Sequence, residues 1–128
     1  MEARLCVVVI DDEEVVGKSV ALLLRKSGCT IYATTKPKEA LALVRKTKPD
    51  VILCDAAMPV MCGPEVIEKL KADPETAHTP VVLMTGFAES HMFGHVGWTG
   101  FLSKPFTAAE LIGALHHAVV TVKKSAGI

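Results

Sequence analysis

The chain has 128 residues, half of them apolar, which suits a globular domain and argues against disorder. Its 14 basic and 14 acidic side chains give a formal net charge of zero, so we expect no direct nucleic-acid binding. No apolar run approaches the roughly 20 residues that cross a bilayer, so we also expect no membrane span.

The first half of the chain predicts two strand–helix units. Residues 5–10 form a continuous apolar run, which is typical of a strand buried on both faces of a parallel sheet. Apolar side chains then recur at helical spacing over residues 16–24, and Gly28 ends this helix. A weaker strand at residues 29–33 and a second helix around residues 40–44 follow.

The second half continues the alternation of strand and helix. Another apolar run predicts a buried strand at residues 51–54, and the pair Gly63-Pro64 opens a third helix, since proline is favoured in a first helical turn. A fourth strand is expected at residues 80–84, where the run is again continuous and apolar.

The stretch that precedes the last strand is the least determined part of the pattern. We expect a shortened fourth helix between Gly86 and Trp98, because the glycines in that stretch disfavour helix. The sequence leaves open whether its apolar side chains pack in the core or face a partner. A weak strand at residues 100–102 and a last helix, opened by a capping box at residues 107–110, complete the pattern.

Five successive strand–helix units predict an α/β fold, an open parallel sheet with helices on both faces. We expect residues 1–128 to form one domain, with a core over residues 5–122 and a tail at residues 123–128. In such folds ligands bind beyond the carboxyl ends of the strands, where the strand order reverses. An order of 2-1-3-4-5, numbered along the chain, would put that point between the first and third strands.

Charged and polar residues gather at these strand ends: Asp11 and Asp12 after the first, Asp55 after the third, Thr85 at the end of the fourth and Lys104 after the fifth. Singly, each has a plainer explanation as a helix cap, a turn or a solvated loop. Together, the converging carboxylates predict a Mg²⁺ site, because close like charges need a cation among them and Mg²⁺ prefers oxygen ligands. A carboxylate nucleophile, a divalent ion and a fixed positive charge are what phosphoryl transfer to an aspartate requires.

Four short motifs, in order and at suitable spacing, carry a family resemblance: VIDDE at 9–13, DAAMP at 55–59 with Gly63, MTG at 84–86 and FLSKPF at 101–106. With them the chain resembles the receiver domains of two-component response regulators, either a single receiver like the chemotaxis regulators or the receiver of a hybrid histidine kinase. The resemblance implies a flavodoxin-like fold with the strand order 2-1-3-4-5.

The resemblance also implies a metal-dependent phosphorylation site. Asp55 would be the phosphorylated residue, receiving its phosphoryl group from a histidine kinase or a phosphotransfer protein. Asp12 and Asp55 would bind Mg²⁺ directly, together with the backbone carbonyl of Ala57, and Asp11 would bind it through water.

Further residues would bind the phosphoryl group and transmit the signal. Thr85 and Lys104 would contact its oxygens, and the bond from Lys104 to Pro105 would be cis. Thr85 and Phe101 would form the switch, with an effector docking on the fourth helix, fifth strand and fifth helix. The stretch between Thr85 and Lys104 is shorter than usual in the family by about one helical turn.

Two positions bear on the lifetime of the phosphorylated form. In the family, side chains two residues after the phosphorylated aspartate and two after the threonine flank the approach of water; here they are Ala57 and Phe87. Neither side chain can orient water, so we expect a signalling receiver that catalyses only its own phosphorylation and a slow dephosphorylation. One alternative is a non-phosphorylated interaction module. A second, more remote one is an aspartyl-phosphate hydrolase, but such enzymes tend to carry a second acid two residues after the nucleophile, where this chain has Ala57.

The cysteines indicate the cellular compartment in which the protein is expected. Cys6, Cys29, Cys54 and Cys62 include no C-x-x-C pair, so we expect no zinc site. Three of them lie in or beside apolar runs, which predicts buried free thiols in a reducing environment. The first residues do not resemble a signal peptide, and we therefore expect a cytoplasmic protein.

Overall fold

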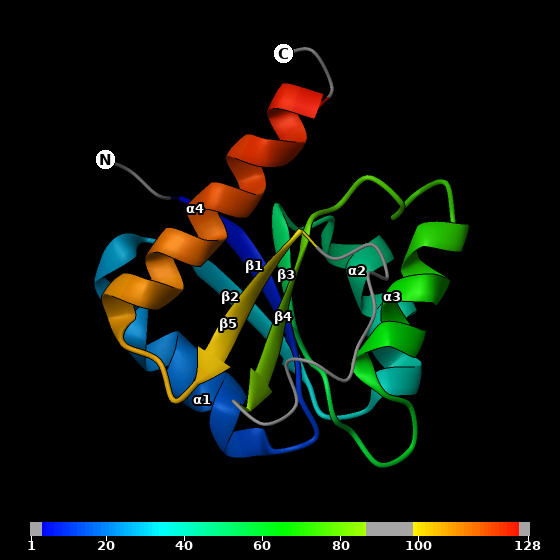
Figure 1. Ribbon diagram of the computed structural model, residues 1–128, viewed down its shortest axis with the longest axis horizontal. Helices are drawn as coiled ribbons and strands as arrows, with labels where there is room; N and C mark the ends of the chain where they lie inside the picture. The colour runs from blue at the N-terminus through cyan, green and yellow to red at the C-terminus, as the bar shows by residue number, and fades with distance from the viewer. Residues whose placement is uncertain (1–3, 87–98, 126–128) are drawn as a thin grey trace.

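The computed structural model describes residues 4–86 and 99–125 (Figure 1). Its strands are β1 (Cys6–Ile10), β2 (Thr30–Thr34), β3 (Val51–Asp55), β4 (Val81–Gly86) and β5 (Gly100–Lys104). All pair in parallel in the order β2-β1-β3-β4-β5, which confirms the predicted flavodoxin-like α/β fold. The shortened fourth helix expected between Gly86 and Trp98 falls outside the described residues.

Helices cover both faces of this sheet. They are α1 (Glu14–Leu23), α2 (Ala40–Thr47), α3 (Gly63–Ala72) and α4 (Ala108–Ser125), with the 3-10 turns η1 (Arg25–Ser27) and η2 (Pro37–Glu39). In Figure 1, α1 and α4 lie on one side of the sheet and α2 and α3 on the other. The helix labelled α4 is therefore the fifth helix of the sequence prediction.

Each face of the sheet has its own apolar core, because side chains alternate between the faces of a strand. On the α1 and α4 side the buried residues include Val7, Val9, Leu53, Val82 and Leu115. On the α2 and α3 side they include Val8, Ile10, Ile52, Val66 and Leu83. The continuous apolar strands of the sequence are thus buried on both faces, as a parallel sheet requires.

The structure shifts several predicted boundaries. β4 runs to Gly86, beyond the predicted residues 80–84, and α4 runs to Ser125, into the predicted tail. The first helix ends at Leu23, which is 36% exposed, and Gly28 closes the turn that follows with a left-handed φ of 75°. A positive φ carries little cost for glycine, which explains its position here.

Two expectations about composition can be compared with the described residues. Cys6, Cys54 and Cys62 are free thiols, but of the four cysteines only Cys54 is buried; Cys6, Cys29 and Cys62 are half-buried, so the expectation of general burial was wrong for them. Within residues 4–86 and 99–125, no helix combines the length and the apolar character that crossing a membrane requires.

Candidate functional site

The loop after β1 presents two aspartates to the carboxyl edge of the sheet. Asp11 is 2% exposed, and its backbone N–H donates to the carbonyl of Thr34 at 3.2 Å. Its Oδ1 accepts a hydrogen bond of 2.9 Å from the backbone N–H of Glu13. Asp12 is exposed. One carboxylate is thus fixed by the backbone, whereas the other faces solvent.

Asp55 ends β3, next to β1, and is 6% exposed. The backbone just after it is held from two sides: the N–H of Ala56 donates to Met84 at 2.8 Å, and its carbonyl accepts from the N–H of Gly63 at 2.9 Å. A Cβ on Gly63 would lie 2.5 Å from the backbone oxygen of Asp55. Only glycine lets α3 begin this close to the aspartate.

Lys104, the last residue of β5, joins the two buried carboxylates. Its Nζ donates to Oδ2 of Asp11 at 2.9 Å and to Oδ1 of Asp55 at 3.1 Å. The lysine side chain is 27% exposed, so the ion pairs lie at the boundary between the interior and solvent. The peptide bond from Lys104 to Pro105 is cis.

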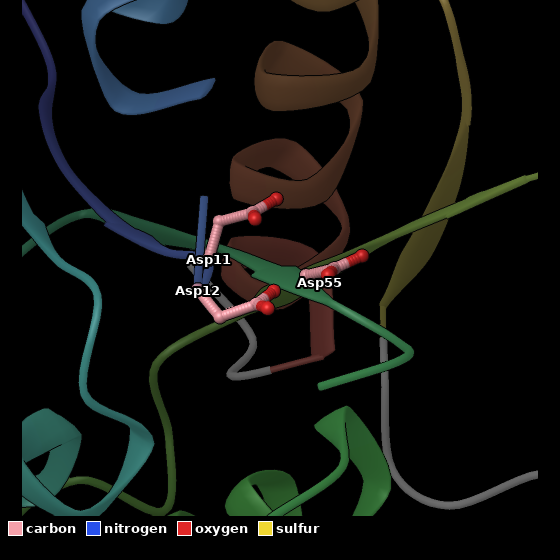
Figure 2. Close-up of side chains that lie close together, drawn as sticks. All are labelled: Asp11, Asp12 and Asp55. Carbon is pink, nitrogen blue, oxygen red and sulfur yellow. The ribbon is translucent and has the colours of Figure 1, made fainter. Parts of the chain in front are cut away.

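The three aspartates form a cluster of possible metal ligands. Asp11, Asp12 and Asp55 each offer one carboxylate oxygen, and these oxygens all lie within 4.8 Å of one another. Figure 2 shows the first two carboxylates on the loop after β1 and the third at the end of β3, on the same side of the sheet edge. Oxygen donors at this spacing match the preference of Mg²⁺ for a few carboxylates and several waters.

The cluster opens into a small cavity of about 290 Å³. Its lining residues come from four different loops or strand ends: Asp12, Glu13, Asp55, Ala57, Gly86 and Lys104. The position predicted to supply a carbonyl ligand, Ala57, therefore lines the same space as the carboxylates. A cavity of this size can hold a phosphoryl group and bound water.

The electrostatics of the site show an excess of negative charge. Burial, and then the charge of Asp11, raise the pKa of Asp55 from 3.8 to about 6, although Lys104 acts in the opposite direction. Burial alone would lower the pKa of Lys104, but its hydrogen bond to Asp11 and the nearby carboxylate charges outweigh this and raise it. One ammonium therefore does not fully compensate the carboxylates, which favours binding of a further cation.

The two predicted switch residues lie on neighbouring strands but in different surroundings. Thr85 is 1% exposed, and its hydroxyl donates to the carbonyl of Gly86 at 3.0 Å. It is not among the residues that line the cavity. Phe101 lies on β5 opposite Leu83 and is 40% exposed. The structure thus brings Asp11, Asp12, Asp55, Ala57 and Lys104 together, and Thr85 directly precedes Gly86, which lines the cavity.

Three positions in and around the site were not among the predicted site residues. Glu13 holds Asp11 through its backbone N–H, and Gly86 lines the cavity. Gly63 permits the close approach of α3 to Asp55. All three residues belong to the recognised motifs, so their presence was visible, but a backbone contact leaves no sign in the side-chain type.

Comparisons with known proteins identify the family of this chain. The family model of the response regulator receiver domain matches residues 7–116. Protein PilG of Pseudomonas aeruginosa is 32% identical over 112 residues, covering 85% of this chain and 83% of PilG. The polar-differentiation response regulator DivK of Brucella anthropi is 34% identical over 109 residues, covering 83% of this chain and 89% of DivK.

Solved structures give the same result. The chemotaxis response regulator CheY4 of Vibrio cholerae superposes with a TM-score of 0.77 at 29% identity, covering 92% of this chain and 99% of CheY4. A response regulator receiver domain protein of Clostridium thermocellum superposes with a TM-score of 0.79 at 26% identity, covering 92% of this chain and 96% of that protein. The chain therefore belongs to the response regulator receiver domain family, the signalling modules of two-component systems.

Proposed function

We propose that this chain accepts a phosphoryl group on Asp55 from the phosphohistidine of a histidine kinase or a phosphotransfer protein, in a Mg²⁺-dependent step. The observation that carries the proposal is the contact of Lys104 with both Asp11 and Asp55, beside the third carboxylate of Asp12. A nucleophile, a metal-ligand set and a fixed cation then share one cavity, as this chemistry requires.

The proposed metal ligands are the carboxylates of Asp12 and Asp55 and the backbone carbonyl of Ala57, with Asp11 acting through water. The close spacing of the three carboxylate oxygens supports this assignment, as does the raised pKa of Asp55, which reflects first its burial and then the nearby charge of Asp11. When bound, Mg²⁺ would neutralise charge on the attacking carboxylate and on the phosphoryl oxygens.

In the proposed reaction, a carboxylate oxygen of Asp55 attacks phosphorus and forms the new P–O bond. The P–N bond to the donor histidine breaks, and its electron pair goes to the imidazole nitrogen, which takes up a proton. Lys104, whose Nζ lies 3.1 Å from Asp55, would bind one phosphoryl oxygen. Thr85, at the end of β4, would bind another through its hydroxyl.

The proposed switch uses the same hydroxyl. A phosphoryl group on Asp55 would draw the Thr85 hydroxyl away from the carbonyl of Gly86, its present acceptor at 3.0 Å. Phe101, exposed on the adjacent strand, would then repack toward the vacated space. The altered face, built on β5 and α4, would receive a downstream effector.

We infer that the site serves phosphorylation of this chain itself and not turnover of an external substrate. Ala57 offers no side-chain acid or base beside Asp55, which supports slow dephosphorylation. The free thiols support a location in the reducing cytoplasm. We propose a free or fused signalling receiver in which Asp55 carries the signal.

The test is phosphoryl transfer from a panel of radiolabelled histidine kinases, or from acetyl phosphate. Wild-type protein should be labelled with Mg²⁺ and not with EDTA, and Asp55→Asn should take up no label. The matched control is Glu68→Gln, which removes an exposed carboxylate on α3 and should be labelled normally. Failure of the wild type to accept label from every donor would favour the non-phosphorylated interaction module.

A further inference from the structure

The outer edge of β2 is an unprotected strand edge. In residues 4–86 and 99–125, β2 pairs only with β1 and ends the sheet. Its sequence, TIYAT, contains no charge and no proline, two of the features that protect an edge strand from pairing. Tyr32 at its centre is 43% exposed, and Ala33 is also exposed.

The hydrogen bonds to β1 fix which backbone groups face outward. The N–H of Thr30 donates to Leu5 at 2.9 Å, and the carbonyl of Thr34 accepts from Asp11 at 3.2 Å. Backbone direction alternates along a strand, so Thr30, Tyr32 and Thr34 all point toward β1. The N–H and carbonyl groups of the residues between them, Ile31 and Ala33, therefore point to the open edge.

The space beside this edge is open on both faces of the sheet. On the α1 side, a groove of about 420 Å³ is lined in part by Ile31, Ala33 and Gly17. On the α2 side, a groove of about 330 Å³ is lined in part by Ala33 and Thr34. Both grooves thus border Ala33, whose backbone groups point to the open edge, and charged side chains of both signs, such as Glu14 and Lys46, line them.

We propose that a second copy of this chain pairs antiparallel with β2, across a two-fold axis that passes beside Tyr32. Ile31 of each copy then faces Ala33 of the other, and each such pair exchanges two backbone hydrogen bonds. The two Tyr32 residues form the close, non-hydrogen-bonded pair between them, an arrangement in which aromatic side chains stabilise a sheet. The result is one continuous sheet through both copies.

A second copy fits this edge better than a charged partner. The strand is uncharged and the formal net charge of the whole chain is zero, so no long-range repulsion opposes self-association. The outward backbone groups are also compatible with a two-fold axis, since those of Ile31 and Ala33 lie symmetrically about Tyr32. An isologous contact of this type closes as a dimer.

The proposed dimer would leave the phosphorylation cavity accessible, because no residue of β2 lines it. The dimer would nevertheless be linked to the site through a hydrogen bond of β2. The last residue of β2, Thr34, accepts the hydrogen bond from the backbone N–H of Asp11. Strand pairing would therefore restrain the loop that carries Asp11 and Asp12, and this inference does not depend on the function proposed for Asp55.

The test is sedimentation equilibrium of the full chain over a wide concentration range. Wild-type protein should show a monomer–dimer equilibrium. Tyr32→Lys and Tyr32→Glu should each weaken it by about ten-fold or more, because like charges would meet at the axis. An equimolar mixture of the two variants should restore the dimer, as opposite charges then meet. Val120→Lys, a matched change at a 51% exposed position on α4, should leave it unaltered.

Circular dichroism of each variant alone establishes that it is folded, so loss of the dimer is not loss of structure. A wild-type chain that stays monomeric at millimolar concentration would overturn the proposal. A dimer that both Tyr32 variants leave unchanged, or that their mixture fails to restore, would place the contact elsewhere and overturn it equally.

Discussion

The ammonium of Lys104 lies 3.1 Å from the carboxylate of Asp55, although the two residues are 49 positions apart in the chain. The pairing results from the sheet topology, because β4 separates β3 from β5 and all three carboxyl ends meet at one edge. Lys104 is thus a built-in counter-ion for the site, and it shares that role with any metal ion that binds the same carboxylates.

Removal of this counter-ion should strengthen metal binding. Lys104→Met should raise the Mg²⁺ affinity of the resting protein by about five-fold or more, since a charge within 4 Å contributes roughly 1 kcal/mol even in a well-solvated site. The same variant should accept a phosphoryl group more slowly. Titration with Mg²⁺, followed by NMR shifts, measures the affinity. The control is Lys69→Met, at an exposed position on α3, which should leave the Mg²⁺ affinity unchanged. A weaker Mg²⁺ affinity in Lys104→Met would contradict the role of Lys104 as a counter-ion.

The charge on Asp55 should destabilise the metal-free fold. Its folded pKa of about 6 lies above the ordinary 3.8, so the folded state holds the proton more tightly than the unfolded state. Stability from this group is therefore present at low pH and is lost as the pH rises from about 4 to 6. In EDTA, Asp55→Asn should be more stable than wild type by roughly 1–3 kcal/mol at pH 8.

Urea unfolding of both proteins at pH 4 and pH 8 measures this effect. The stability difference between Asp55→Asn and wild type should shrink toward zero at pH 4, where the carboxyl group is largely protonated in the folded state. An Asn variant that is less stable than wild type at pH 8 would show that the contact with Lys104 outweighs burial, opposite to our assignment.

Gly63 should tolerate no side chain. A Cβ there would lie 2.5 Å from the backbone oxygen of Asp55 and 2.9 Å from the Cδ1 of Leu83, so Gly63→Ala should cost roughly 1–3 kcal/mol of stability. Because the strain acts on the backbone of Asp55, phosphorylation should slow as well. The control is Gly113→Ala in α4, where a Cβ meets nothing within 4 Å. That change should be neutral or stabilising by up to about 1 kcal/mol.

The lifetime of the phosphorylated form should depend on position 57. Ala57 lines the cavity beside Asp55 and has no group that can orient an attacking water. Ala57→Asn should therefore accelerate dephosphorylation, by up to about 100-fold, while phosphorylation persists. Decay of radiolabelled protein after removal of the donor measures the rate. Equal decay in wild type and variant, or loss of wild-type label within seconds, would contradict this expectation.

The sequence predicted the central strands β1, β3 and β4 well because they are buried on both faces and so read as unbroken apolar runs. It predicted the gathering of Asp11, Asp12, Asp55 and Lys104 because each follows a strand and parallel strands end at one edge. It could not show that Lys104 bridges two of the carboxylates, since side-chain contacts depend on packing between distant segments.

Backbone contacts were the least predictable part of the site. Nothing in the residue type at position 13 shows that its N–H fixes Asp11, and a glycine at position 63 indicates only that space is scarce, not what occupies it. The exposure of Leu23 was equally unpredictable from the sequence. Helical spacing indicates which face of a helix is apolar, but the neighbouring elements determine how much of that face is buried.

Reductive trapping of the phosphorylated chain tests the central claim most directly. Borohydride converts a phosphorylated aspartate into homoserine, and peptide mass spectrometry then locates the converted position. After incubation with acetyl phosphate and Mg²⁺, our account predicts conversion at Asp55 alone, and none when EDTA replaces Mg²⁺. Conversion at Asp11, Asp12 or another carboxylate, or no conversion under phosphorylating conditions, would contradict it.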